Sequence, residues 1–169
     1  ATFLLTVVFD LVVAVEVGLV LASLFFIYRM QDLARVERIP LEAFYGSAVR
    51  DAEGRTRILA FELYGSLFFG AIGKIEAQLD PAHIRADVVI LDMGKVISLD
   101  TTVLENLDTL RSTLSKRGTA LIVCGLHAQP GSLLRRSGFA EAIGSDNLRD
   151  NLTDAILRAQ EIASSNDHG

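Results

Sequence analysis

The sequence has few of the residues on which catalysis, metal binding and disulfide scaffolds usually depend. Its 169 residues include one cysteine, three histidines and no tryptophan. A single cysteine, Cys124, excludes an internal disulfide and fits a reducing compartment. The acidic balance, 21 Asp and Glu against 16 Lys and Arg, gives no reason to expect a nucleic-acid partner. What the chain has in excess is apolar residues, which make up 50% of it.

Basic residues are absent before Arg29, and that part of the chain is almost entirely apolar. From Phe3 to Ile27 only Asp10 and Glu16 are charged. About 20 apolar residues suffice to cross ~30 Å of hydrocarbon, and a cleaved signal peptide would show a basic start and a shorter apolar core. The run therefore predicts a transmembrane α-helical segment. Because a carboxylate at the bilayer centre costs a few kcal/mol, one solution places a turn near Asp10.

The basic residues that follow the apolar run orient it. Arg29, Arg35 and Arg38 come directly after it, so the positive-inside rule predicts that everything after Tyr28 is cytoplasmic. A chain that opens inside an apolar run also predicts further membrane helices upstream. The expected organisation is the end of a transmembrane domain at 1–29 with its last crossing at about 11–28, a connector at 30–41, a cytoplasmic domain at 42–164 and a tail at 165–169.

Strand-like and helical segments alternate along the rest of the chain. Consecutive β-branched and aliphatic residues, best developed in ADVVILDM at 86–93, predict strands that are covered on both faces. The expected strands are 41–49, 57–63, 86–93 and 119–124. Apolar residues at helical spacing predict helices at 69–79, 102–116, 130–138 and 148–163. This order predicts an α/β domain, a sheet with packed helices, preceded by the membrane segment.

Patterns that would indicate an enzyme are missing. There is no glycine-rich phosphate loop, and the scattered glycines make no dinucleotide fingerprint. His83, His127 and His168 have no metal-ligand spacing among themselves or with Cys124. Cys124 ends an apolar strand with no base placed beside it, so it is interpreted as a core thiol. We expect no catalytic, cofactor-binding or metal-binding residue, and no enzyme.

One loop carries local chemistry, Asp100-Thr101-Thr102, at the start of the expected helix. Thr102 followed three residues later by Glu105 is a capping box, in which the hydroxyl and the carboxylate each satisfy a free backbone N–H. Such a cap is worth about 1 kcal/mol. Alternatively, because a helix N-terminus favours negative charge, a threonine there could carry a regulatory phosphate. Both interpretations stand at this point.

The segments around this loop resemble the STAS domain, which anti-sigma-factor antagonists share with the cytoplasmic tails of SulP-type anion transporters. The resemblance rests on VVILDMGKVISLDTTVLENLDTLRSTLSKRGTALIVC at 88–124 and on LLRRSGF at 133–139. Asp100, Thr101 and Thr102 fall on the first three positions of the family's phospho-acceptor-like loop, whose fourth position, usually glycine, is Val103. The resemblance implies the STAS-type, anti-sigma-factor-antagonist-like sheet with packed helices.

The N-terminal segments resemble the SulP branch, that of sulfate permeases and prestin. FLLTVVFDLVVAVEVGLVLASLFFIYRM at 3–30 is similar to the end of a SulP transmembrane domain, and GSLFF at 65–69 is similar to a segment before the first STAS helix. This resemblance implies a multi-pass membrane carrier of sulfate, bicarbonate or dicarboxylates. It further implies a homodimer formed through a transmembrane domain missing here, and a cytoplasmic STAS domain that regulates transport or meets a cytosolic regulatory protein. The alternative is a membrane-tethered STAS signalling module of the anti-sigma-factor-antagonist type.

Overall fold

A computed structural model describes residues 2–31, 35–51, 53–67 and 86–166. The chain divides into two compact units, residues 1–33 and 34–169. The helix expected at 69–79 lies outside the described residues.

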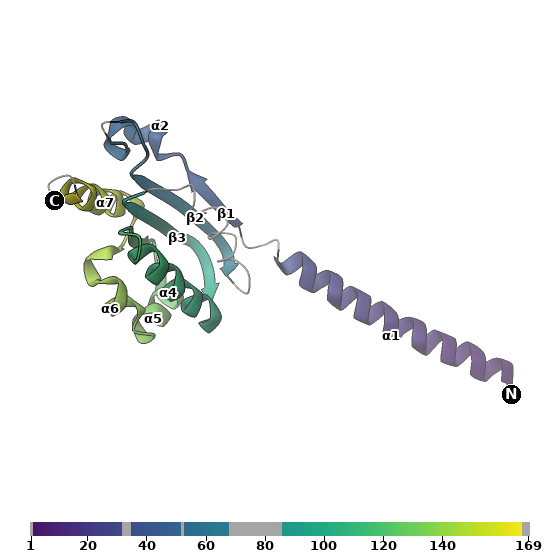
Figure 1. Ribbon diagram of the computed structural model, residues 1–169. Helices are drawn as coiled ribbons and strands as arrows, with labels where there is room; N and C mark the ends of the chain where they lie inside the picture. Colours follow the sequence, from purple (N-terminus) through teal and green to yellow (C-terminus); the bar gives the residue numbers. More distant parts are fainter. Residues whose placement is uncertain (1, 32–34, 52, 68–85, 167–169) are drawn as a thin grey trace. The chain divides into compact units, whose positions relative to one another are not determined.

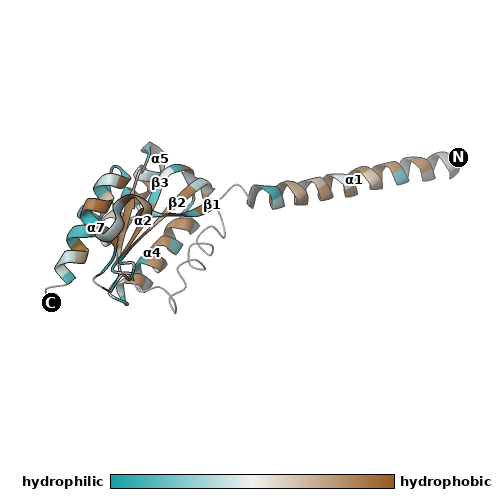
Figure 2. Ribbon diagram, turned by 90° about the horizontal axis from the view of Figure 1, so that it is seen from above, coloured by the Kyte–Doolittle hydropathy of each residue, from teal (hydrophilic) through white to brown (hydrophobic). Residues whose placement is uncertain are grey.

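The first unit is one unbroken helix, α1, from Thr2 to Gln31 (Figure 1). The turn considered near Asp10 is therefore wrong, because Asp10 continues the helix and no glycine or proline is nearby to break it. Within α1, Asp10–Arg29 has a mean hydropathy of 2.4 and buries none of its residues inside the chain. By length and composition this stretch can cross a membrane, and Figure 2 shows apolar residues around the helix.

The second unit is built on a five-stranded sheet in the order β1-β2-β3-β4-β5. β1 is antiparallel to β2, and the remaining neighbours are parallel. The strands are β1 Arg35–Ile39, β2 Ile58–Leu67, β3 Val88–Leu99, β4 Ala120–Cys124 and β5 Leu148–Arg149. The strands expected at 57–63, 86–93 and 119–124 are confirmed, with β2 and β3 longer at their carboxyl ends than expected.

Two segments differ from expectation at the edges of this sheet. The strand expected at 41–49 is instead a short helix, α2 Leu41–Tyr45, followed by the 3-10 turn η1 Gly46–Val49. Only Leu41 and Val49 of this segment are buried, whereas a half-buried strand would also bury the alternate positions between them. The edge strand β1 comes from the expected connector, where it pairs the backbone groups that β2 would otherwise leave open.

Helices cover both faces of the sheet (Figure 1). They are α4 Thr101–Ser115, α5 Ala128–Arg136, α6 Phe139–Ile143 and α7 Leu152–Asn166, with the 3-10 turn η2 Ser145–Asn147 before β5. Apolar side chains of α4, α5 and α6 form one core with the sheet, and those of α7 and α2 form a second core on the other face. The helix expected at 148–163 begins four residues late, because Leu148 and Arg149 pair with β4 as a strand.

Arg57 ties the start of the sheet to the end of α7. Its guanidinium donates to the Asp87 carboxylate and, at 2.6 Å, to the backbone oxygen of Ala163. The Arg57 side chain is only 14% exposed, and a cation near a helix C-terminus also meets the negative end of the helix dipole. This one side chain therefore joins the residues directly before β2 and β3 to α7.

We expect Arg57→Ala to lower the free energy of unfolding by about 2 kcal/mol, because it removes the donor that the half-buried Asp87 carboxylate and the Ala163 oxygen share. Arg55→Ala is the matched control, since Arg55 is 65% exposed and its ion pairs lie at the surface. Unfolding is measured in detergent by the labelling of the chain's one thiol, Cys124, as urea is added. In the folded chain this thiol is protected, because burial and then the nearby Asp92 carboxylate raise the pKa of Cys124 to about 12. Equal losses in both variants would contradict the role given to Arg57.

A β-bulge bends β3 just beyond the part that β4 covers. The register with β2 runs from Glu62↔Asp92 to Tyr64↔Lys95, so β3 has one residue more than its neighbour. Both backbone groups of Gly94 find partners outside the ladder: its N–H donates to Asp92 Oδ1 at 2.8 Å, and its oxygen lies 2.6 Å from His127 Nε2. Beyond this point β3 curves on to Leu99, which brings Asp100 to the start of α4 (Figure 1).

Gly125 packs against this bulge and cannot carry a side chain. Its φ is +72°, and an added Cβ would lie 2.7 Å from both Asp92 Oδ1 and Gly94 N. We expect Gly125→Ala to cost about 3 kcal/mol of unfolding free energy, through left-handed strain together with the clash. Gly118→Ala is the control, because Gly118 has a φ of +75° with nothing within 4 Å, so it should show the strain alone, about 1 kcal/mol. Urea titration monitored at the Cys124 thiol compares them, and equal costs would refute the close approach.

Candidate functional site: a groove between α4 and α6

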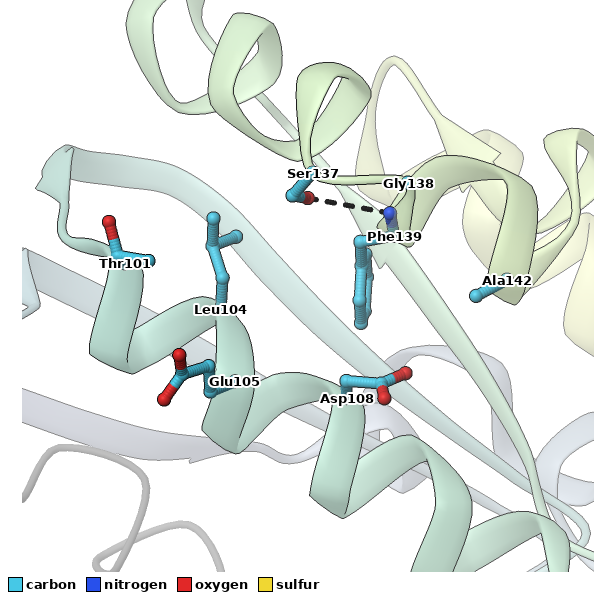
Figure 3. Close-up of a pocket in the computed structure, with 8 residues that line it drawn as sticks. All are labelled: Thr101, Leu104, Glu105, Asp108, Ser137, Gly138, Phe139 and Ala142. Atoms are coloured by element: carbon cyan, nitrogen blue, oxygen red, sulfur yellow. Dashed lines mark hydrogen bonds between the residues drawn. The ribbon is translucent and has the colours of Figure 1, made fainter.

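A groove of about 460 Å³ opens between the first half of α4 and the turn that begins α6 (Figure 3). Its floor is apolar and its edges carry hydroxyl and carboxylate groups. The lining residues are Thr101, Leu104, Glu105, Asp108, Ser137, Gly138, Phe139 and Ala142. The groove thus joins the Asp100–Thr102 loop to the Ser137-Gly138 segment, two stretches singled out from the sequence.

Asp100, and not Thr102, caps the α4 side of the groove. Its backbone is extended, with φ −104° and ψ 171°, and its carboxylate accepts the Val103 N–H at 2.8 Å. The capping box of Thr102 with Glu105 is therefore wrong: the helix begins one residue earlier than expected, so Thr102 already lies inside the first turn. This leaves the Glu105 carboxylate free of a capping role.

The α6 side is built by a serine–glycine turn. Ser137 Oγ donates to the Leu134 oxygen at 2.9 Å. It also accepts from the Phe139 N–H at 3.4 Å, the hydrogen bond that is dashed in Figure 3. Gly138 takes a φ of +77°, a left-handed conformation that glycine adopts without strain. The chain thereby reverses and puts Phe139, 4% exposed, against the core beside α4.

The three loop residues predicted from the sequence occupy different places. Asp100 is half-buried in its cap, Thr101 is exposed and lines the groove, and Thr102 is half-buried and does not line it. Sequence reasoning gave Leu104 and Phe139 no part in a site, since both were assigned to apolar or family patterns. Only the reversal at Gly138 brings Phe139 opposite the start of α4.

The groove is acidic and holds no evident reactive centre. Asp108 forms an ion pair with Arg111 at 2.8 Å, whereas Glu105 pairs with no cation in the part of the chain that the structure describes. The Ser137 hydroxyl is engaged with backbone groups. Among the described residues no three His, Cys, Asp or Glu side chains lie close enough together to hold a metal ion. The arrangement suits binding more than bond making.

Comparison with known proteins gives the family. Residues 50–155 match the STAS domain, which is more than half of the chain. The chain belongs to the STAS domain family. A crystal structure titled as a sulfate transporter family protein from Wolinella succinogenes superposes with a TM-score of 0.59 at 26% identity, and covers 68% of this chain and 96% of that one. This likeness confirms the STAS fold predicted from the sequence.

The curated relatives are transporters by name. The chain is 32% identical over 151 residues to "Putative sulfate transporter YvdB" of Bacillus subtilis, a match that covers 89% of this chain and 28% of the relative. It is 25% identical over 166 residues to "Bicarbonate transporter BicA" of Synechocystis, covering 94% of this chain and 29% of that protein. The chain therefore spans less than a third of the length of these relatives. Its STAS domain is homologous to STAS domains of SulP transporters.

The cap assignment predicts which substitution destabilises α4. Asp100→Ala should lower the free energy of unfolding by about 1 kcal/mol, because the Val103 N–H loses its acceptor. Thr102→Ala should change it little, and Asp100→Asn should restore most of the loss because asparagine also caps. The Cys124 labelling assay measures all three. A loss in Thr102→Ala with none in Asp100→Ala would return the cap to Thr102.

Proposed function

We propose that this chain is the C-terminal part of a SulP-type secondary anion transporter, with α1 as its last membrane crossing and the second unit as a cytoplasmic STAS domain. The observation that carries the proposal is the extent of the match to YvdB. Only 136 residues follow Leu33, so a match over 151 residues must include part of α1 as well as the STAS domain. The similarity to this relative therefore extends from the STAS domain into the residues of the apolar helix.

The charges around α1 support the proposed topology. Arg29 ends the apolar stretch, and Arg35 and Arg38 on β1 follow it closely, a distribution that favours the cytoplasmic side for the second unit. Asp10 and Glu16 lie within the helix, where lipid would penalise them. We infer that they face other helices of a complete multi-pass protein. Dimerisation through that transmembrane domain belongs to the same proposal.

The anion is proposed only as a class. The names of the relatives mention sulfate and bicarbonate, and dicarboxylates complete the class implied by the family resemblance. In secondary transporters the substrate lies near the bilayer midplane, between interrupted helices that α1 does not provide. The STAS domain would then act on transport without touching the anion, through a regulatory or interaction surface, and without an enzymatic reaction. The groove, with Asp100, Thr101 and Thr102 at one end, is our candidate for that surface.

Uptake by the complete protein tests this proposal. Liposomes that contain the complete protein should take up more labelled sulfate, bicarbonate or dicarboxylate than protein-free liposomes do. An excess of the same unlabelled anion should reduce this uptake. The same protein with a stop codon after Leu33 is the control that reports how much flux needs the STAS domain. Absence of uptake for all three anions by a folded protein, or a gene product with only one membrane anchor, would favour the signalling-module alternative.

A further inference from the structure

The last residues of β3 form an extension of the sheet that β4 does not reach. The pairing of β3 with β4 stops at Asp92↔Cys124, whereas the pairing of β3 with β2 continues to Leu67↔Leu99 (Figure 1). On one face of this two-stranded extension, Leu67, Val96 and Leu99 are at most 5% exposed and belong to the core. The extension is therefore packed on one side by the domain itself.

The opposite face carries an exposed apolar residue beside a lysine and a tyrosine. Ile97 is 73% exposed, although isoleucine is among the residues that proteins most often bury. Lys95, which alternates with the buried Val96 and so lies on the same face as Ile97, holds its Nζ 4.6 Å from the centre of the Tyr64 ring. Tyrosine and lysine, with an apolar body and a polar tip, are typical of residues at a membrane–water interface.

The chain enters the domain at this same end of the sheet. β1 is antiparallel to β2, and its first residue, Arg35, pairs with Tyr64, whose neighbour on β3 is Lys95. Adjacent strands lie ~4.8 Å apart, so two strand spacings, ~10 Å, separate the backbone at Arg35 from that at Lys95. From Lys95, β3 runs on to Ile97 in the direction opposite to β1. Ile97 thus lies at the end of the domain where the chain arrives from α1.

The covalent chain limits how far this end of the sheet can be from a membrane. Residues 32–34 alone separate Gln31, the end of α1, from Arg35, and four residue steps span at most ~14 Å when fully extended. This limit holds for every orientation of the two units. With the stretch up to Arg29 across a bilayer, Arg35 stays near the headgroups. A tether this short gives the contact a high effective concentration, so that even a weak contact is populated.

The charges near the entry point are suited to an anionic surface. Arg29 and Arg35 have no carboxylate partner among the residues that the structure describes. Lys95 is paired with Glu62, whose Oε1 lies 2.9 Å from Nζ, and Glu37 lies two residues farther from α1 than Arg35 does. The unpaired positive charge is therefore concentrated toward α1. Basic residues next to a membrane segment are attracted by the anionic lipids of the cytoplasmic leaflet.

We propose that the carboxyl end of β2 and β3 rests on the surface of the membrane. The Ile97 side chain enters the headgroup region, Arg35 pairs with lipid phosphates, and the Lys95–Tyr64 pair lies at the boundary with water. The occupant of this face is an anionic phospholipid surface. The inference goes beyond the proposed transport function and rests on one part of it, the placement of α1 in the bilayer. Such a contact holds the domain in one orientation and so determines which of its surfaces remain open to the cytosol.

The absence of tryptophan from the chain allows a direct test. Ile97→Trp and Phe44→Trp each introduce one fluorophore at an apolar position of matched exposure, 73% and 76%, and Phe44 lies on α2, beyond the other end of β1. Each full chain is placed in nanodiscs of phosphatidylcholine and phosphatidylglycerol, with acyl chains brominated close to the headgroup or left unbrominated. Bromine should lower the emission of the Ile97→Trp chain about threefold, because tryptophan there lies in the interface, and should leave that of Phe44→Trp unchanged.

A second pair of variants tests the contribution of charge. In the Ile97→Trp chain, Arg35→Gln should reduce the quenching about twofold, because one cation near the lipid phosphates is lost. Arg55→Gln is the matched control, since Arg55 is 65% exposed and precedes the opposite end of β2. It should leave the quenching unchanged. Quenching should also weaken as phosphatidylglycerol is replaced by phosphatidylcholine and as salt is added, because exposed charges are screened.

Equal quenching of the Ile97→Trp and Phe44→Trp chains, or none in either, would overturn the inference. Quenching that depends neither on Arg35 nor on the charge of the lipid would overturn it as well. The Ile97→Trp substitution in the complete protein separates lipid from protein as the occupant. Loss of quenching there would show that the rest of the transmembrane domain covers this face, which also contradicts the proposal.

The proposed function is measured by other observables. Flotation of the chain with vesicles reports the insertion of α1, and uptake by the complete protein reports anion transport. An unquenched tryptophan in a chain that floats with the vesicles would therefore refute the lipid contact alone. Failure to float would instead refute the placement of α1 on which both proposals rest.

Discussion

The domain depends on burying the central strand β3 on both faces at once. Val88, Val89, Ile90 and Leu91 are each at most 1% exposed, and they alternate between the two cores. A strand of this kind is stable only if helices cover both sides, so α4, α5 and α6 must lie on one face and α7 on the other. Arg57 adds a polar tie where the amino ends of β2 and β3 meet the end of α7.

The same strand determines where the groove between α4 and α6 lies. β3 continues beyond the part paired with β4, and the bulge at Gly94, packed against Gly125, redirects it toward the start of α4. The carboxyl ends of parallel strands are where α/β sheets usually offer binding sites, because the loops there leave the core. Here the loop is short and ends in the Asp100 cap, so the exposed chemistry shifts to the first turns of α4 and to the turn at Gly138 opposite them.

Residues that stabilise the helix and residues that line the groove lie within a few positions of one another. The Asp100 carboxylate caps the helix backbone, whereas the Thr101 and Glu105 side chains line the groove. Phe139 contributes to both, since one part of its ring packs in the core and the residue also lines the groove. The lining of the groove can therefore vary at Thr101 and Glu105 while the cap and the core are maintained.

Much of the fold follows from sequence pattern alone, because its signals are local. The apolar run of α1, the buried strands β3 and β4 and the heptad-like spacing of α4 each show in consecutive residues, and the loop pattern at 100–102 indicated the family. The edge strands, the helix cap and the groove were decided only by the tertiary structure, because they depend on residues that are neighbours in space and not in sequence. β1 forms from a polar connector because β2 needs an edge partner, and β5 takes Leu148 and Arg149 from a helix because β4 offers its free edge. Asp100 and not Thr102 is the cap because β3 runs on to Leu99 and α4 begins at Thr101. The groove depends on Gly138, where the chain reverses and sets Phe139 beside α4. These features depend on contacts between residues far apart in the chain, which local pattern does not record.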